Sequence, residues 1–286
     1  MDRPDAGRRL IVGDTQVAVP RKRLTRRRRR QLVLGGEYAA FVIALVALAV
    51  LADWGSLKQN FANLDVAKSL FPDIITIGLR NTLIFTLAGF AAGFVAGLII
   101  ALMRLSSVPP YRWLAMAYIE AFRGLPAVLI FIFVGVGVPL AFGGSVVPGG
   151  VYGQVTLALG LVSAAYMAET IRAGIQAVPR GQMEAARSLG MSHSRAMGSI
   201  IIPQAFRIVI PPLTNELVLL FKDSSLALFI GISLQQRDLA KFGQDLAGEK
   251  GNSTPIIVAG LCYLLITIPL GYAARRIEAR QRRAQR

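Results

Sequence analysis

Four polar side chains interrupt a long apolar stretch in the C-terminal third of the sequence: Asn215, Glu216, Lys222 and Asp223. An ionisable group at the centre of a membrane-spanning helix costs about 2.5–3.5 kcal/mol, so it needs a reason to be there. Pro211 and Pro212 precede these residues and are predicted to interrupt the span. They lack backbone N–H groups, which leaves carbonyl oxygens free. Amide, carboxylate and carbonyl oxygens together would bind the cationic end of a polar solute.

A second interpretation is that the charges only neutralise one another inside the protein. The available pairs are Glu120 with Arg123, Glu169 with Arg172, and Glu216 with Lys222. Both interpretations stay open for the group that begins at Asn215. Lys222 and Asp223 are also candidates for gating or bracing the external end of a path, and Tyr166 is a further candidate for its lining.

The elements that must position these residues are apolar blocks. The chain has 286 residues, of which 54% are hydrophobic and 17% are charged, whereas soluble domains carry roughly 25% charged residues. Several blocks reach the length of about 20 residues that a helix needs to cross a bilayer. We therefore predict an all-α polytopic membrane protein with six membrane-spanning helices, near residues 37–53, 74–103, 113–142, 151–178, 205–232 and 254–274.

The first of these spans has two interpretations. Its unbroken apolar part, residues 38–52, is short enough for a signal-peptide core, and Ala47–Ala49 resembles a cleavage site. Leu32–Leu34 and Trp54 extend the apolar stretch and supply an interfacial aromatic, which favours a retained helix at residues 36–54.

The charge distribution predicts the topology. With six spans and both ends inside, 24 of the 32 Lys and Arg residues fall on the cytoplasmic side and 6 on the external side, as the positive-inside rule expects. Residues 1–35 are then a basic cytoplasmic arm and residues 276–286 a basic cytoplasmic tail. The net charge of +16 thus reflects basic flanks of apolar spans, and no interleaved aromatic residues support nucleic-acid binding.

The glycine pattern, the single cysteine and the single histidine support further predictions. Gly89, Gly93 and Gly97 form a doubled Gly-x-x-x-Gly pattern, which allows close helix contact either within the chain or in a dimer. The single cysteine, Cys262, rules out a disulfide framework, and the single histidine, His193, has no ligand partners for a metal.

A polar segment separates the fourth and fifth spans. Residues 181–189 are good helix formers, Gly190 is a natural stop, and Ser192 or Ser194 can cap a second short helix. On the predicted topology this helix–turn–helix lies in the cytoplasm between two spans. Such a placement suits an element that receives force from a partner, although an ordinary interfacial helix has the same composition.

The same segment, EAARSLGMSHSRAMGSIIIP at residues 184–203, resembles the EAA loop of permease subunits of ATP-binding cassette importers. Glu184, Ala185 and Ala186 match its start, Gly190 follows after three residues, and Pro203 closes it; Ile202 replaces the usual leucine. The stretches EAFRGLP (120–126), AETIRAGIQAVPRGQ (168–182) and PPLTNELVLLFKDSSL (211–226) resemble the polar amino acid uptake branch. The likeness spans residues 77–277.

The resemblance implies a five-helix permease domain at residues 74–275, preceded by an additional helix, with a cytoplasmic coupling loop at 179–203. It implies that the loop docks on a separate ATPase subunit through Glu184, Ala185, Ala186, Leu189, Gly190 and Pro203. ATP and Mg²⁺ would be bound there, because this chain has no G-x-x-x-x-G-K-[ST] phosphate loop. We expect no enzymatic activity, cofactor or metal in the chain itself.

The other implied partners are an external solute-binding protein, a second permease subunit, identical or not, and the lipid bilayer of a bacterial plasma (inner) membrane. The solute would be a polar amino acid, whose ammonium group could use the carbonyls near Pro211 and Pro212. Two alternatives remain: an ion-gradient-driven secondary transporter of small polar solutes, for which no internal repeat is evident, and a basic-armed membrane scaffold, which leaves the intramembrane charges unexplained.

Overall fold

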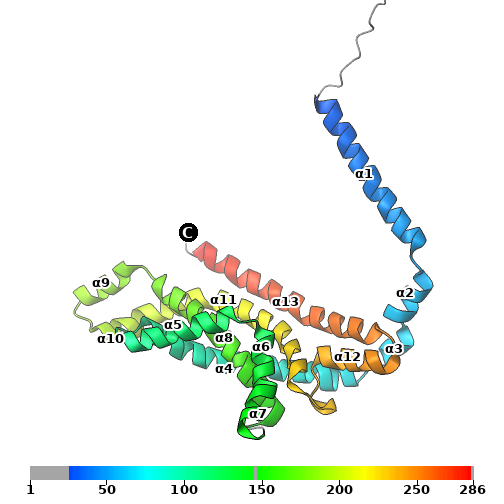
Figure 1. Ribbon diagram of the computed structural model, residues 1–286. Coiled ribbons are helices and arrows are strands. Elements are labelled where there is room, and N and C mark those ends of the chain that lie inside the picture. Colours follow the sequence, from blue (N-terminus) through cyan, green and yellow to red (C-terminus); the bar gives the residue numbers. More distant parts are fainter. Residues whose placement is uncertain (1–25, 145–146, 285–286) are drawn as a thin grey trace, which may run out of the picture. The chain divides into compact units, whose positions relative to one another are not determined.

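The computed structural model describes residues 26–144 and 147–284, and over these residues all regular structure is helical (Figure 1). Five helices are long and apolar enough to cross a membrane, or six when one sharply bent helix pair counts as a single span. This confirms the predicted all-α polytopic fold. The chain divides into two units, Met1–Trp54 and Gly55–Arg286, which we describe separately.

The described part of the first unit contains helix α1 (Arg26–Leu51), whose candidate membrane span covers Arg30–Leu51. The Trp54 indole nitrogen donates a hydrogen bond to the Ala49 carbonyl at 2.6 Å. A helix is therefore present where the extra N-terminal span was predicted. Most of the predicted basic arm lies outside the described residues, so that part of the prediction stays untested.

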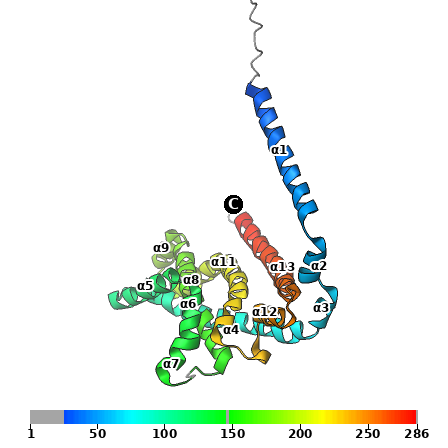
Figure 2. The same ribbon diagram turned by 45° about the vertical axis from the view of Figure 1, so that its right-hand side comes forward.

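The second unit is built around α4 (Arg80–Leu105) and α8 (Gly150–Gln176), which lie alongside each other (Figures 1 and 2). A π-helical segment, Ile74–Leu79, leads into α4. The glycines of the doubled Gly-x-x-x-Gly pattern are buried in this contact. A Cβ atom on Gly93 would lie 1.9 Å from Ser163 Oγ, so the pattern serves packing within the chain.

Replacing Gly93 with alanine should therefore destabilise the protein, because the added methyl group has to displace Ser163 and part of α8. Overpacking of this kind costs roughly 1–3 kcal/mol. Gly260→Ala is the matched control, since nothing lies within 4 Å of a Cβ at that position. We expect Gly93→Ala to lower the thermal unfolding temperature in detergent and Gly260→Ala to leave it unchanged. If Gly93→Ala unfolded at the same temperature as the wild type, α4 and α8 would have to pack differently.

The predicted third span is not one continuous helix. The structure has α5 (Pro109–Gly124), followed after Leu125 and Pro126 by α6 (Ala127–Ile132), a π-helical segment to Gly137, and α7 (Val138–Phe142). The two halves meet at 105°. The cause is local, because a residue before proline avoids the helical region, and Leu125 has φ −89° and ψ 140°.

The fifth span also differs from the prediction. α11 (Ile202–Asp223) continues through Pro211 and Pro212, where an interruption was expected. The helix changes instead into a 3-10 segment at Ser224–Ile230, which ends at Gly231 with φ +77°. The prolines still lack N–H donors for the preceding turn, so the prediction of free carbonyl oxygens does not depend on a break.

Two regions predicted as external loops contain short helices. α2 (Trp54–Phe61) and α3 (Leu64–Ser69) precede α4, while α12 (Leu239–Lys250) lies between α11 and α13 (Thr254–Ala284). These helices are too polar to be predicted from apolar blocks in the sequence. α13 extends beyond the predicted end of the sixth span into the predicted basic tail, whose residues 285–286 lie outside the described part of the chain.

Asp238 fixes the position of α12. Its carboxylate accepts hydrogen bonds from the N–H groups of Ala240 (2.9 Å) and Lys241 (3.2 Å), as an N-cap does, and from the Tyr263 hydroxyl of α13 (3.0 Å). Burial raises the pKa of this carboxyl above its ordinary value, while these donors act in the opposite direction. Thr82 of α4 adds a further tie by accepting from the Leu239 N–H at 3.0 Å.

Asp238→Ala removes both the cap and the partner of Tyr263. A lost cap costs about 1 kcal/mol and a lost hydrogen bond about 1 kcal/mol more, so we expect clear thermal destabilisation in detergent. The control is Asp245→Ala, which removes the partly exposed ion pairs with Lys241 and Arg237 and should cost less, because exposed ion pairs contribute little to stability. If the control lost as much as Asp238→Ala, the capping role would be wrong.

Candidate functional site

The segment between α8 and α11 is a helix–turn–helix. α9 (Arg180–Ser188) ends at a left-handed residue, Gly190, with φ +83°. The Met191 N–H donates to the Ala186 carbonyl at 3.1 Å and the Gly190 N–H to the Arg187 carbonyl at 3.0 Å, which together form a Schellman motif. Ser192 then caps α10 (His193–Ala196) through the Arg195 N–H.

The side chains of this segment divide between an outer and an inner face. Glu184, Ala185 and Leu189 are exposed, and Leu189 keeps 85% of its surface open. Ala186, in contrast, is 2% exposed, so its methyl group packs inside this chain and is not part of the outer face. Pro203 lies exposed in the first turn of α11.

A small hydrophobic cluster holds the segment on the spans. Val178, Ile201 and Ala205 are buried together, and Met183 of α9 packs against them. The helix–turn–helix is therefore attached through its inner face, while its outer face remains available.

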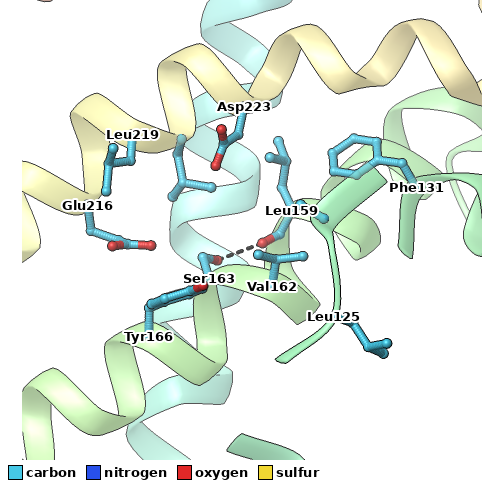
Figure 3. A pocket seen from close by; sticks show the side chains of 11 residues that line it. Leu125, Phe131, Leu159, Val162, Ser163, Tyr166, Glu216, Leu219 and Asp223 are labelled. Carbon is cyan, nitrogen blue, oxygen red and sulfur yellow. Dashed lines mark hydrogen bonds between the residues drawn. The ribbon is translucent and has the colours of Figure 1, made fainter. Parts of the chain in front are cut away.

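A pocket of about 210 Å³ lies between α8, α11 and the start of α6 (Figure 3). Its polar lining comes from four residues: Ser163 and Tyr166 on α8, and Glu216 and Asp223 on α11. The remaining lining is apolar and is supplied by Leu125, Ala127, Phe131, Leu159, Val162, Leu219 and Leu220. Because drug-sized ligands occupy roughly 300–1,000 Å³, this pocket suits a smaller solute.

The geometry of the helices explains why these residues meet. Ser163 and Tyr166 are three residues apart on α8, and Glu216 and Asp223 are seven apart on α11, so each pair shares one helix face. The break at Leu125 turns the chain away from α5 and brings the start of α6 to the same place. Tyr118 of α5 is tied to α8 by a hydrogen bond from its hydroxyl to the Leu161 carbonyl at 2.7 Å.

The structure brings together three of the five predicted path residues, Tyr166, Glu216 and Asp223. Asn215 and Lys222 are exposed and do not line this pocket.

Charge neutralisation accounts for one of the three proposed pairs. Glu169 and Arg172 form an ion pair, with the Arg172 Nε 2.9 Å from a Glu169 carboxylate oxygen. Within residues 30–144 and 147–279, no ion pair joins Glu120 to Arg123 or Glu216 to Lys222. Neutralisation by a neighbouring lysine therefore does not explain Glu216.

Two residues near the pocket were not predicted as lining groups. Ser163 donates its hydroxyl proton to the Leu159 carbonyl at 2.7 Å. Its sequence context gives no sign that it lines a pocket, because its position depends on how α8 packs against its neighbours. Arg123, which the sequence analysis considers only as a charge partner of Glu120, has its guanidinium 5.5 Å from the centre of the Tyr166 ring. A Glu-x-x-Arg spacing within α5 gives no signal for this contact with α8.

Several membrane-crossing helices, a polar pocket among them and an exposed helix–turn–helix between two of them define a membrane transport subunit. The family model described as binding-protein-dependent transport system inner membrane component matches residues 93–283. The chain belongs to this family, and it is accordingly a multi-pass inner-membrane transport protein.

Individual relatives agree with this assignment. The chain is 40% identical to the probable glutamine ABC transporter permease protein GlnM of Bacillus subtilis over 71% of this chain and 91% of that protein. It is 34% identical to the arginine transport system permease protein ArtQ of the same organism, over 76% and 96%. A crystal structure of an amino acid ABC transporter with histidines matches with a TM-score of 0.67 and 34% identity, over 76% of this chain and 97% of that one.

The fold extends to more distant proteins. An inward-facing structure of the MetNI methionine ABC transporter matches with a TM-score of 0.60 at 20% identity, over 73% of this chain and 98% of that one. The family assignment confirms the predicted resemblance to importer permeases and disfavours the secondary-transporter alternative.

Proposed function

We propose that this chain forms the path by which a polar amino acid crosses the membrane in an ATP-driven importer. The observation that carries the proposal is the polar pocket between α8 and α11, which Glu216 and Asp223 line without forming an ion pair with any residue in the described part of the chain. Polar groups inside membrane-spanning helices mark solute pathways. The amino acid transporters among the relatives support the class of solute.

The second part of the proposal is that residues 179–203 couple the path to a separate ATPase subunit. The outer face of α9, with Glu184, Ala185 and Leu189, would contact that subunit, and Gly190 would set the turn. ATP and Mg²⁺ would be held by the ATPase. Movement of the docked segment would be transmitted to α8 and α11, because the cluster around Val178 joins the two.

The remaining partners follow from the importer assignment. An external solute-binding protein would deliver the amino acid, and a second permease subunit, identical or related, would complete the membrane unit. Asn215 and Lys222 remain predicted path residues outside this pocket.

The function is tested by uptake into proteoliposomes that contain this chain with its ATPase and solute-binding protein. We expect accumulation of a polar amino acid that needs ATP and Mg²⁺ and persists when ionophores dissipate ion gradients. Uptake that follows an imposed ion gradient without ATP would contradict the proposal.

The orientation of the termini is a separate part of the proposal. If α1 is a retained span and both ends are cytoplasmic, a reporter fused at Met1 should stay inaccessible from outside and remain attached to the mature protein. Recovery of a mature chain that starts near Val50 would show that the first apolar span is cleaved.

A further inference from the structure

Arg123 is a charged residue in the middle of the broken third span. It lies in the last turn of α5, just before the 105° break between α5 and α6, and its side chain is exposed. A charged side chain at this depth is costly and usually has a functional role. Within residues 30–144 and 147–279 it forms no ion pair. Its guanidinium lies instead 5.5 Å from the centre of the Tyr166 ring, which is a cation–π contact.

Tyr166 marks one end of the pocket between α8 and α11. It is the last lining residue along α8, and Glu216 is the first along α11. Because the helix–turn–helix follows α8 and precedes α11, both residues lie at the end of the pocket nearest that segment (Figure 3). Arg123, over the Tyr166 ring, therefore lies beside the same end of the pocket.

A second partner for Arg123 lies just beyond this end. Glu169 is three residues after Tyr166 on the same face of α8, a rise of about 4.5 Å. It forms an ion pair with Arg172 and is also attracted electrostatically by Arg123. A carboxylate has about four acceptor positions, so Glu169 can accept from Arg123 while it keeps Arg172. Arg123 thus has a ring at the pocket and a carboxylate outside it as alternative partners.

The break after α5 allows Arg123 to move relative to α8. Leu125 at the break has an extended backbone, and Pro126 has no N–H group to bond back into α5. Leu125 and Ala127 of α6 both line the pocket. A change in the angle between α5 and α6 would therefore shift Arg123 and Leu125 together against Tyr166.

We infer that Arg123 and Tyr166 form a gate across the end of the pocket nearest the helix–turn–helix. The gate is closed when the guanidinium lies on the Tyr166 ring, as in this structure. It is open when Arg123 pairs with Glu169 and leaves the ring uncovered. Each arrangement gives the charge a partner, as a two-state element requires. This inference rests on the proposed function, because a gate is needed only if the pocket is the path.

The test measures access to the pocket from the helix–turn–helix side. The full chain, with its ATPase and without nucleotide, is studied in membrane vesicles that expose that side to the medium. It carries Cys262→Ser, which removes its single cysteine, and Leu219→Cys, which places a thiol on an exposed position of the pocket wall. The probes are a cationic and an anionic membrane-impermeant methanethiosulfonate, and labelling is followed as the mass increase of this chain. Cys262→Ser alone should not be labelled.

Arg123→Gln and Tyr166→Leu should each speed labelling by about threefold or more, because each removes one half of the cation–π contact. Arg123→Lys keeps a cation and Tyr166→Phe keeps the ring, so both should label at nearly the wild-type rate. The two probes distinguish a gate from a local change in charge. Opening speeds labelling by both, whereas loss of a positive charge alone would speed the cationic probe and slow the anionic one.

Three results would overturn the gate: unchanged labelling in Arg123→Gln and Tyr166→Leu, opposite changes for the two probes, or equal acceleration in Arg123→Lys and Tyr166→Phe. The last would show that any change at these positions disturbs the packing. None of them bears on the proposed function, which is tested separately by ATP-dependent uptake of the wild-type chain. Absent uptake together with the expected labelling pattern would refute the path and not the contact.

Discussion

Replacing Gly190 with valine is expected to leave the chain in the membrane at normal abundance while abolishing ATPase binding and amino acid uptake. Gly190 has φ +83°, where an L-residue costs roughly 1–2 kcal/mol and a β-branched one is a strong outlier. The Schellman hydrogen bonds of Met191 and Gly190 depend on that conformation. The substituted segment would redirect α10 relative to α9 and misplace the outer face.

The spans should be unaffected, because their stability comes from lipid and helix packing and not from this turn. No atom outside the adjacent residues lies within 4 Å of a Cβ at Gly190, so the effect is conformational and not a clash. Gly190→Asn is the matched control, since asparagine tolerates left-handed backbone, and it should retain much of the activity. Normal ATPase binding by Gly190→Val would remove the turn from the coupling mechanism.

Glu216→Gln is expected to lower amino acid uptake by about ten- to a hundredfold. Hydrogen bonds to a charged group contribute roughly 1.5–3 kcal/mol, and each 1.4 kcal/mol corresponds to a factor of ten. Glutamine keeps the size of the side chain and removes its charge, so the pocket between α8 and α11 should retain its shape. Uptake in proteoliposomes and co-purification of the ATPase measure the two consequences separately.

Co-purification of the ATPase should stay normal for Glu216→Gln, because Glu216 lies in the second half of α11, whereas the helix–turn–helix precedes the first turn of α11. The control for removing a carboxylate from a helix in the same unit is Glu120→Gln, since Glu120 is exposed on α5. Uptake that is unchanged in Glu216→Gln for several amino acids would exclude this carboxylate from the path.

Local signals in the sequence predict the spans and the turn. Apolar blocks have to be as long as the membrane is thick, so the helices at residues 74–105, 150–176 and 254–279 were found within a few residues. Gly190 was found because few other residues end a helix in the left-handed conformation. The polarity of Glu216 and Asp223 was equally visible, since each interrupts an apolar run.

Features that depend on the register between helices could not be predicted in the same way. The EAA spacing does not show that Ala186 faces inward while Ala185 faces outward. Ser163 packs against Gly93 of α4 and also lines the pocket, and both placements depend on the register between helices. The bend at Leu125 had a sequence signal, Pro126, but the continuous apolar run around it favoured one straight span.

The claim that α9 is the docking surface for the ATPase is tested most directly by photo-crosslinking from Leu189. This side chain is 85% exposed, and a photoreactive residue at this position in the assembled importer should crosslink to the ATPase subunit. The same residue at Leu265 of α13, which is 74% exposed, should give no such product. If the complex is intact and position 189 yields no ATPase crosslink, or position 265 yields an equal one, the docking surface has been assigned to the wrong part of the chain.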